Sequence, residues 1–304
     1  ADGVDRSEAR ANPDADGLAS SGSDAQARAD AEASSGAGAA RRASRRGVRV
    51  RTHQVAVGGA SVTVREWGPP DGSPLLQLHA LGPAASAALT DLMVGPLVAR
   101  GVRVVAPDGP GFGGSEALPP QEYAVPLLAD RVWALAERLG LEELVLVGHS
   151  WGGAIACHAA AAHPERVRAL VLLDSGHLDY RDAPGVDLET TLEKAIERAR
   201  GTSWEVGSRA DLEEMLGIED PARRARLADL MLHGLTSDGS GGLVATTPCE
   251  VRGAVLFHLS HALQSETWPV IAEAGIPTLL LLATEPPEAA ELNRVAADRF
   301  AAAV

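Results

Sequence analysis

Short runs of apolar or nearly apolar residues, each bounded by turn residues, constrain most strongly what this chain can fold into. They lie at 75–78, 102–106, 144–147, 170–173 and 279–282. Such runs are typical of the central strands of a parallel sheet, which neighbouring elements cover on both faces. The sequence therefore predicts a buried sheet assembled from segments far apart along the chain.

Helical patterns separate these runs. Between residues 121 and 140, apolar residues recur at three- and four-residue steps, at Val125, Leu128, Val132, Leu135 and Leu139. Alternating strands and helices indicate βαβ units with right-handed crossovers. Ahead of them, residues 48–57 and 61–68 alternate apolar and polar side chains on either side of Gly59, which predicts an antiparallel hairpin. The expected fold class is α/β, with a doubly wound, mostly parallel sheet.

The chain divides by composition into a tail and two parts of a folded body. Residues 1–47 consist mainly of Ala, Asp, Gly, Ser and Arg, which cannot bury enough surface to offset the entropy of ordering, so a disordered tail is expected. Residues 48–176 and 269–304 carry the sheet pattern. Residues 177–268 interrupt it with helical patterns and a loop-like stretch at 237–248. We expect this insertion to form a helical lid over the sheet edge where ligands bind.

Charge and composition exclude several classes of function. A formal net charge of −14 argues against binding nucleic acid, which requires clustered positive charge. No apolar run is long enough to span a membrane, and the first residues do not resemble a secretory signal. Cys157 and Cys249 are too few and too distant for a metal site or a disulfide framework. A cytoplasmic chain without a metal, with a small molecule as its partner, is expected.

The strongest local motif is Gly148-His149-Ser150-Trp151-Gly152, between the apolar run 144–147 and a helical pattern. In that context a serine lies at a strained turn, and the glycines allow the backbone to fold tightly around it. The hydroxyl then faces out at the carboxyl end of the strand, and the start of the following helix stabilises negative charge. The motif predicts a nucleophilic serine at Ser150.

Two further loops follow strands that end at the same sheet edge. Leu78-His79-Ala80-Leu81-Gly82 follows the first run, and a backbone N–H from Leu81 can join that of Trp151 in holding an oxyanion. Asp108 opens the glycine-rich stretch 108–115 after the second run and brings another loop to the same rim. The order of these motifs along the chain supports an acyl-transfer site.

In these motifs the chain resembles the α/β-hydrolase family, specifically its capped, esterase-like members, over roughly residues 50–304. The resemblance implies Ser150 as nucleophile, Leu81 and Trp151 as oxyanion donors, and no metal or organic cofactor. It also implies supporting loops built around His79, Gly148, His149, Gly152 and Asp108. The family usually has His-Gly where this chain has His79-Ala80, and alanine tolerates a positive φ poorly, so an oxyanion loop of a different shape is expected.

The remaining members of a catalytic triad are less clearly marked. The resemblance places the acid after the run 279–282, where Glu285 stands, while Asp174, after the run 170–173, is the alternative. No histidine follows Glu285 before the last residue, Val304. We therefore expect a truncated chain that lacks both its catalytic histidine and its last strand. Such a chain is nearly inactive by itself and has an exposed apolar sheet edge.

The expected function is hydrolysis of an ester or a related acyl bond through an acyl-serine intermediate. A serine in place of an aspartate argues against dehalogenases and epoxide hydrolases, which form an alkyl-enzyme ester. Carbon–carbon bond hydrolysis and perhydrolysis use the same serine machinery and stay open as alternatives. A different class of function, a non-catalytic protein whose lid pocket binds a small apolar ligand, also stays open because the base is missing.

Overall fold

The computed structural model describes residues 48–83, 85–86, 94–201, 205–283 and 287–304. The expected tail at 1–47 and the candidate acid Glu285 lie outside these residues. Among the residues described, no helix is long and apolar enough to cross a membrane.

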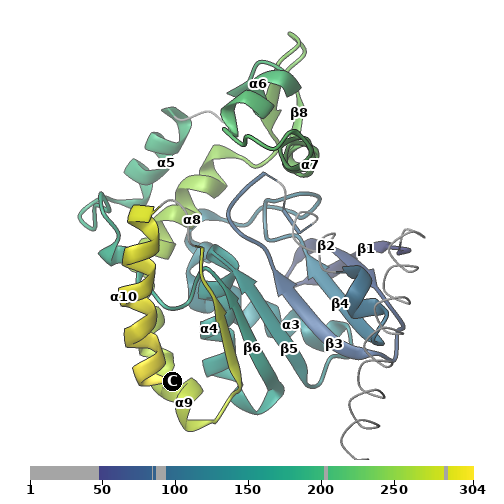
Figure 1. The fold of residues 1–304 in the computed structure, drawn as a ribbon, viewed down its shortest axis with the longest axis vertical. Helices are drawn as coiled ribbons and strands as arrows, with labels where there is room; N and C mark the ends of the chain where they lie inside the picture. The colour runs from purple at the N-terminus through teal and green to yellow at the C-terminus, as the bar shows by residue number, and fades with distance from the viewer. Residues whose placement is uncertain (1–47, 84, 87–93, 202–204, 284–286) are drawn as a thin grey trace, which may run out of the picture. The chain divides into compact units, whose positions relative to one another are not determined.

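A seven-stranded sheet forms the centre of the fold, in the order β1-β2-β4-β3-β5-β6-β10. The strands from β4 to β10 in that order pair in parallel, whereas β1 and β2 pair antiparallel with each other and β2 pairs antiparallel with β4. Figure 1 shows the sheet with helices packed along it. The strands span Arg51–Val57 (β1), Ala60–Trp67 (β2), Ser73–Leu78 (β3), Val102–Pro107 (β4), Leu144–His149 (β5), Val167–Leu173 (β6) and Thr278–Leu281 (β10).

This arrangement confirms the predicted fold class. Every run expected as a central strand pairs in parallel with at least one neighbour, and the expected hairpin turns at Gly58 and Gly59, both at positive φ. Residues 75–76 and 144–147 are largely buried because strands in the middle of the order are covered on both faces.

Two apolar clusters pack on the two faces of the sheet. The larger one is formed with the helices α3 (Val125–Arg138), α4 (Trp151–Ala162), α9 (Trp268–Glu273) and α10 (Pro287–Ala303). The predicted stripe on α3 is buried in it at four positions, with Leu139 partly buried just beyond the helix end. The smaller cluster joins Trp67, Val104 and Val147 to a helical stretch at 94–98.

The insertion between β6 and α9 contains both helices and a small sheet. Two helices start at side-chain caps, Ser208 for α6 and Asp220 for α7, as is typical of helix N-termini. The elements are the 3-10 helix η3 (Tyr180–Asp182), α5 (Leu192–Gly201), β7 (Glu205–Val206), α6 (Arg209–Met215), α7 (Pro221–Met231), the 3-10 helix η4 (Leu232–Gly234), β8 (Leu235–Ser237), β9 (Leu243–Ala245), α8 (Cys249–His261) and the 3-10 helix η5 (Gln264–Glu266).

The stretch at 237–248, expected as a loop, takes part in a three-stranded antiparallel sheet of order β7-β9-β8. Its turn is closed by the Asp238 carboxylate, which accepts hydrogen bonds from the backbone of Ser240 and Gly242. The sequence pattern missed this sheet because strands of two or three residues are too short to show an alternation.

Candidate active site

Ser150 lies at the turn between β5 and α4, where it caps the helix with φ 50° and ψ −119°. A positive φ is strained for a residue with a side chain, and such strain persists only where the surroundings enforce it. Here the Ser150 N–H donates to the Leu173 carbonyl (3.2 Å), and the Ser150 carbonyl accepts from the N–H of Gly153 (2.8 Å). Ser150 itself is half-buried at the carboxyl end of β5.

The glycines around Ser150 allow this turn to pack. A Cβ added at Gly148 would lie 2.5 Å from the Gly153 Cα, and one added at Gly152 would overlap the backbone carbonyl of Leu78. Distances this short are not tolerated between nonbonded atoms, so both positions require glycine. The tight turn also brings the start of α4 directly against the end of β3.

Trp151 is the first residue of α4, so its backbone N–H belongs to the group that helix geometry leaves without an intrahelical partner. The positive end of the helix dipole adds to the attraction for negative charge at this point. The Trp151 indole is only 2% exposed and contacts the rings of Phe112 and His79, with centroids 5.2 and 5.7 Å away. The backbone at Trp151 is therefore held by a buried aromatic cluster.

His79 joins the loop after β3 to the loop after β4. Its Nε2 accepts a hydrogen bond from the Gly109 N–H (2.7 Å), so the ring proton lies on Nδ1 and is donated to the Ala80 carbonyl (2.7 Å). Burial lowers the pKa of the His79 ring below its ordinary 6.5, although the Ala80 carbonyl opposes this effect. The ring is therefore a neutral cross-link between two loops.

Asp108 is buried and holds the loop after β4. Its Oδ1 accepts from Arg65 (2.7 Å) and from the Ser86 hydroxyl (2.6 Å), and its Oδ2 accepts from the Gly114 N–H (3.1 Å). These bonds use both carboxylate oxygens inside the protein. Asp108 thus shapes the rim of the site and does not face a substrate.

Leu81 lies in the loop after β3 and packs, half-buried, against the large core cluster. The insertion touches the same loop, because a Cβ added at Gly234 would overlap the Pro83 carbonyl. The insertion also reaches the rim elsewhere, where the His258 ring bonds the Pro120 carbonyl (3.0 Å). The loop that is expected to supply one oxyanion donor is thus in contact with the insertion.

Asp174, the alternative acid, directly follows β6 and has φ 49°. Its Oδ1 accepts hydrogen bonds from the Ala283 N–H (3.0 Å) and from the Asn293 side chain on α10 (2.8 Å). Its charge also acts on His149, where burial lowers the pKa of the ring and the Asp174 carboxylate opposes that effect. The carboxylate therefore joins β6 to the segment that follows β10, close to the site.

Within the described part of the chain, which includes all nine histidines, no histidine ring hydrogen-bonds to Ser150. The rings of His233 and His261 bond to carbonyls of their own helical segments. His177 is 2% exposed, and neither of its ring nitrogens has a hydrogen-bond partner. The described residues also contain no group of three side chains suited to hold a metal ion.

The sequence reasoning missed one residue that contacts the nucleophile turn. The Ser175 hydroxyl donates to the backbone carbonyl of Ser150. The signal available in the sequence was weak, a hydroxyl directly after Asp174. Tyr180, at the start of the insertion, packs half-buried against the large core cluster, and burial raises the pKa of its phenol.

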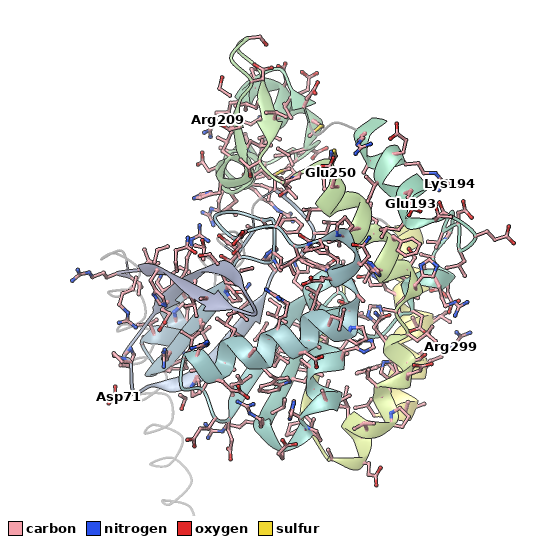
Figure 2. The ribbon with its side chains drawn as sticks, turned by 180° about the vertical axis from the view of Figure 1, so that it is seen from behind. Asp71, Glu193, Lys194, Arg209, Glu250 and Arg299 are labelled. Atoms are coloured by element: carbon pink, nitrogen blue, oxygen red, sulfur yellow. The ribbon has the colours of Figure 1, made fainter. Side chains whose placement is uncertain are left out.

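An apolar cavity of about 60 Å³ borders the aromatic cluster around Trp151. Trp151 and His79 form part of its wall, and side chains of α3 such as Leu128 and Val132 form another part. Figure 2 shows the molecule from the side opposite to Figure 1, with its side chains drawn. Part of the space between α3 and the aromatic cluster is therefore not filled by side chains.

Comparison with known proteins identifies the fold. Residues 74–201 match the family model described as the alpha/beta hydrolase fold. A thioesterase domain from the curacin biosynthetic pathway has the same fold, with a TM-score of 0.61 and 20% identity over 82% of this chain and 89% of that domain. The chain thus has the α/β-hydrolase fold, and the match to that family lies in residues 74–201.

Individual relatives are hydrolases. The chain is 39% identical to 2-hydroxymuconate semialdehyde hydrolase of Pseudomonas sp. (strain CF600) over 116 residues, which are 38% of this chain and 41% of that enzyme. It is 28% identical to a serine hydrolase-like protein of Danio rerio over 229 residues, 72% of this chain and 67% of that protein. The chain thus spans less than half the length of the first of these relatives.

Proposed function

We propose that this chain carries the nucleophile and the oxyanion site of a serine hydrolase that cleaves an ester or a related acyl bond. The single observation that supports this most strongly is Ser150 at positive φ between a parallel strand and a helix N-terminus. A strained, glycine-dependent turn has little purpose unless the hydroxyl at its tip is used. Ser150 is also half-buried, and therefore partly accessible to a substrate.

In the proposed reaction, the Ser150 Oγ attacks the substrate carbonyl and loses its proton to a base. Negative charge develops on the carbonyl oxygen, where the backbone N–H groups of Trp151 and Leu81 stabilise it. Collapse of the tetrahedral intermediate expels the leaving group and gives an acyl-serine, which water then hydrolyses. The His79 cross-link and the Asp108 bonds hold the two loops that frame this site.

The proposed reaction needs a base, and no described histidine forms a hydrogen bond with Ser150. A serine hydroxyl without a base is a poor nucleophile at neutral pH, so we expect slow turnover by this chain alone. Free imidazole at millimolar concentration should accelerate acylation if the rest of the site is formed.

We assign the insertion at 177–268 the role of a lid, since it contacts the loop of Leu81. Two free cysteines support a reducing, cytoplasmic location.

A second candidate function is hydrolysis of a carbon–carbon bond next to a carbonyl. The similarity to 2-hydroxymuconate semialdehyde hydrolase favours it, with 39% identity over the 116 matched residues. Both candidates need Ser150 and differ in the leaving group. Incubation with a short-chain aryl ester and with a ring-cleavage dienoate, followed by mass spectrometry of the products, separates them.

Labelling with a fluorophosphonate probe tests the serine assignment directly. With free imidazole present as the base, we expect modification of Ser150, identified by peptide mass spectrometry, and its loss in Ser150→Ala. Ser260→Ala is the matched control, because the Ser260 hydroxyl bonds only to the Leu256 carbonyl of its own helix. An imidazole-dependent burst of phenol release from an aryl ester should likewise be absent in Ser150→Ala. Labelling at a different residue would overturn the proposal.

A further inference from the structure

Both backbone groups of Ser150 are bonded to the segment that ends β6. The Ser150 N–H donates to the Leu173 carbonyl (3.2 Å), and the Ser150 carbonyl accepts a hydrogen bond from the Ser175 hydroxyl. Asp174, between these two partners, has φ 49°, and Ser150 has φ 50°. Backbone in this region persists only where its surroundings enforce it. The strained turn of the nucleophile is therefore held from both sides by one segment.

The Ser175 side chain occupies space that residue 153 leaves free. Ser175 is only 2% exposed. A Cβ added at Gly153 would overlap the Oγ of Ser175 and would lie 2.5 Å from its Cβ. Atoms cannot approach this closely without a bond, so the glycine at 153 provides the room for the Ser175 side chain against the first turn of α4. Packing as well as hydrogen bonding thus fixes the position of this hydroxyl.

The Ser150 carbonyl and the Trp151 N–H belong to the same peptide unit. This unit is planar, so the two groups point in opposite directions and can only turn together. The carbonyl also accepts from the backbone N–H groups of Gly153 (2.8 Å) and Ala154 (3.2 Å) within α4. Ser175 adds a donor from outside the helix. A hydrogen bond to this carbonyl both fixes the direction of the Trp151 N–H and polarises the amide, which makes that N–H a stronger donor.

We propose that Ser175 is a positioning residue for the oxyanion site, and that its hydroxyl directs the Trp151 N–H through the peptide unit that joins Ser150 to Trp151. The inference rests on the proposed function, which makes this N–H an oxyanion donor. The Ser175 hydroxyl is buried and bonded to backbone, so it acts without touching a substrate. Its effect is largest when negative charge develops on the substrate oxygen and small when the substrate first binds.

Selective isotope labelling observes this peptide unit directly. The chain contains two Ser-Trp pairs, at 150–151 and at 203–204. Protein that carries carbonyl-13C serine and 15N tryptophan gives one carbonyl–amide correlation for each pair, and Ser203→Ala assigns them because it deletes the second. We expect Ser175→Ala to move the 150–151 correlation, since a donor to its carbonyl is lost, and to leave the 203–204 correlation in place.

The kinetic part measures the imidazole-dependent burst of phenol release from an aryl ester over a range of ester concentrations. Ser175→Ala should slow the burst at saturating ester about tenfold, because a misdirected oxyanion donor loses part of its effect. The half-saturating ester concentration should stay unchanged. Ser175→Cys fills the same space with a weaker donor and should also slow the burst, which separates the hydrogen bond from packing.

Ser265→Ala is the matched control for both measurements. Its hydroxyl also bonds to the segment after β6, at the Asp179 carboxylate (2.6 Å), but does not bond to Ser150. This variant should match the wild type in the burst and in both correlations. Circular dichroism and urea unfolding confirm that the variants fold.

Three results would overturn the inference. They are a 150–151 correlation that stays in place in Ser175→Ala, a burst in that variant that matches the wild type, and a higher half-saturating ester concentration with an unchanged burst rate. Failure of the proposed function looks different, because the wild type then shows no burst and its Ser150 is not labelled by the fluorophosphonate even with imidazole. In that case the role of Ser175 fails together with the proposed function.

Discussion

The His79 ring accepts a hydrogen bond from the Gly109 backbone N–H at 2.7 Å, and this bond joins the loops that follow β3 and β4. A ring in this bond cannot take up a second proton without losing its acceptor atom. The integrity of the rim around Ser150 is therefore linked to the protonation of a buried histidine.

Acidification should destabilise the fold through this group. The folded pKa of His79 lies below 6.5, because burial lowers it, whereas the unfolded ring titrates near its ordinary value. The unfolded state thus binds the proton first, and the free energy of unfolding should fall as the pH drops below about 6.5. Burial lowers the pKa values of His149, His158 and His258 in the same direction.

Urea unfolding at a series of pH values between 7.5 and 5 measures this effect. His79→Gln should be less stable than the wild type at pH 7.5 and should lose less stability on acidification. Ser260→Ala, which removes no titratable group, should keep the wild-type slope. A free energy of unfolding that stays constant over this range would contradict the linkage.

Gly148→Ala should disrupt the nucleophile turn. The new methyl group would lie 2.5 Å from the Gly153 Cα, where backbone cannot move aside, and we expect a loss of about 1–3 kcal/mol in the free energy of unfolding. Gly201→Ala is the control, because its Cβ would meet nothing within 4 Å at the end of α5. Thermal or urea unfolding checks both, and equal stabilities for the two variants would show that the turn is not close-packed.

Asp174 should contribute to the stability of the fold, in addition to its candidate role as the catalytic acid. Its carboxylate accepts from Ala283 and Asn293, so Asp174→Ala should cost about 1–3 kcal/mol of stability, in part because alanine tolerates φ 49° poorly. Asp174→Asn keeps a side chain that favours this backbone region and should cost less. Urea unfolding measures the stabilities and fluorophosphonate labelling the reactivity of Ser150. A hundredfold loss of labelling in a stable Asp174→Asn variant would instead identify the triad acid.

The β10 edge should make the chain associate with itself. Leu279 and Leu281 pair in register with Val171 and Leu173 of β6 and are 52% and 51% exposed, which leaves apolar side chains beside a strand edge. Leu279→Lys and Leu281→Lys should lower light scattering at high protein concentration. Leu256→Lys, at an equally exposed leucine on α8, should have little effect. A wild-type chain that sediments as a monomer at high concentration would contradict this expectation.

Most of the central architecture follows from local pattern. The apolar runs at 144–147 and 170–173 form neighbouring parallel strands, and the apolar stripe of α3 packs on the core. Both were predictable because a strand buried on both faces gives a continuous apolar run and a helix buried on one face gives an apolar residue every three or four positions. The motif around Ser150 is equally local, since the strained turn needs glycines at fixed spacing. The roles assigned to Leu81, Trp151 and Asp174 stay predictions.

The contacts that surround Ser150 were decided by the tertiary structure alone. Ser175 reaches the Ser150 carbonyl, and Asp174 reaches Asn293, only because parallel strands and their crossovers bring together segments that lie far apart in the chain. The His79 tautomer likewise depends on a backbone N–H thirty residues away. Sequence periodicity reports which face of an element is buried, whereas partners across elements depend on register and loop geometry, which leave no periodic signal.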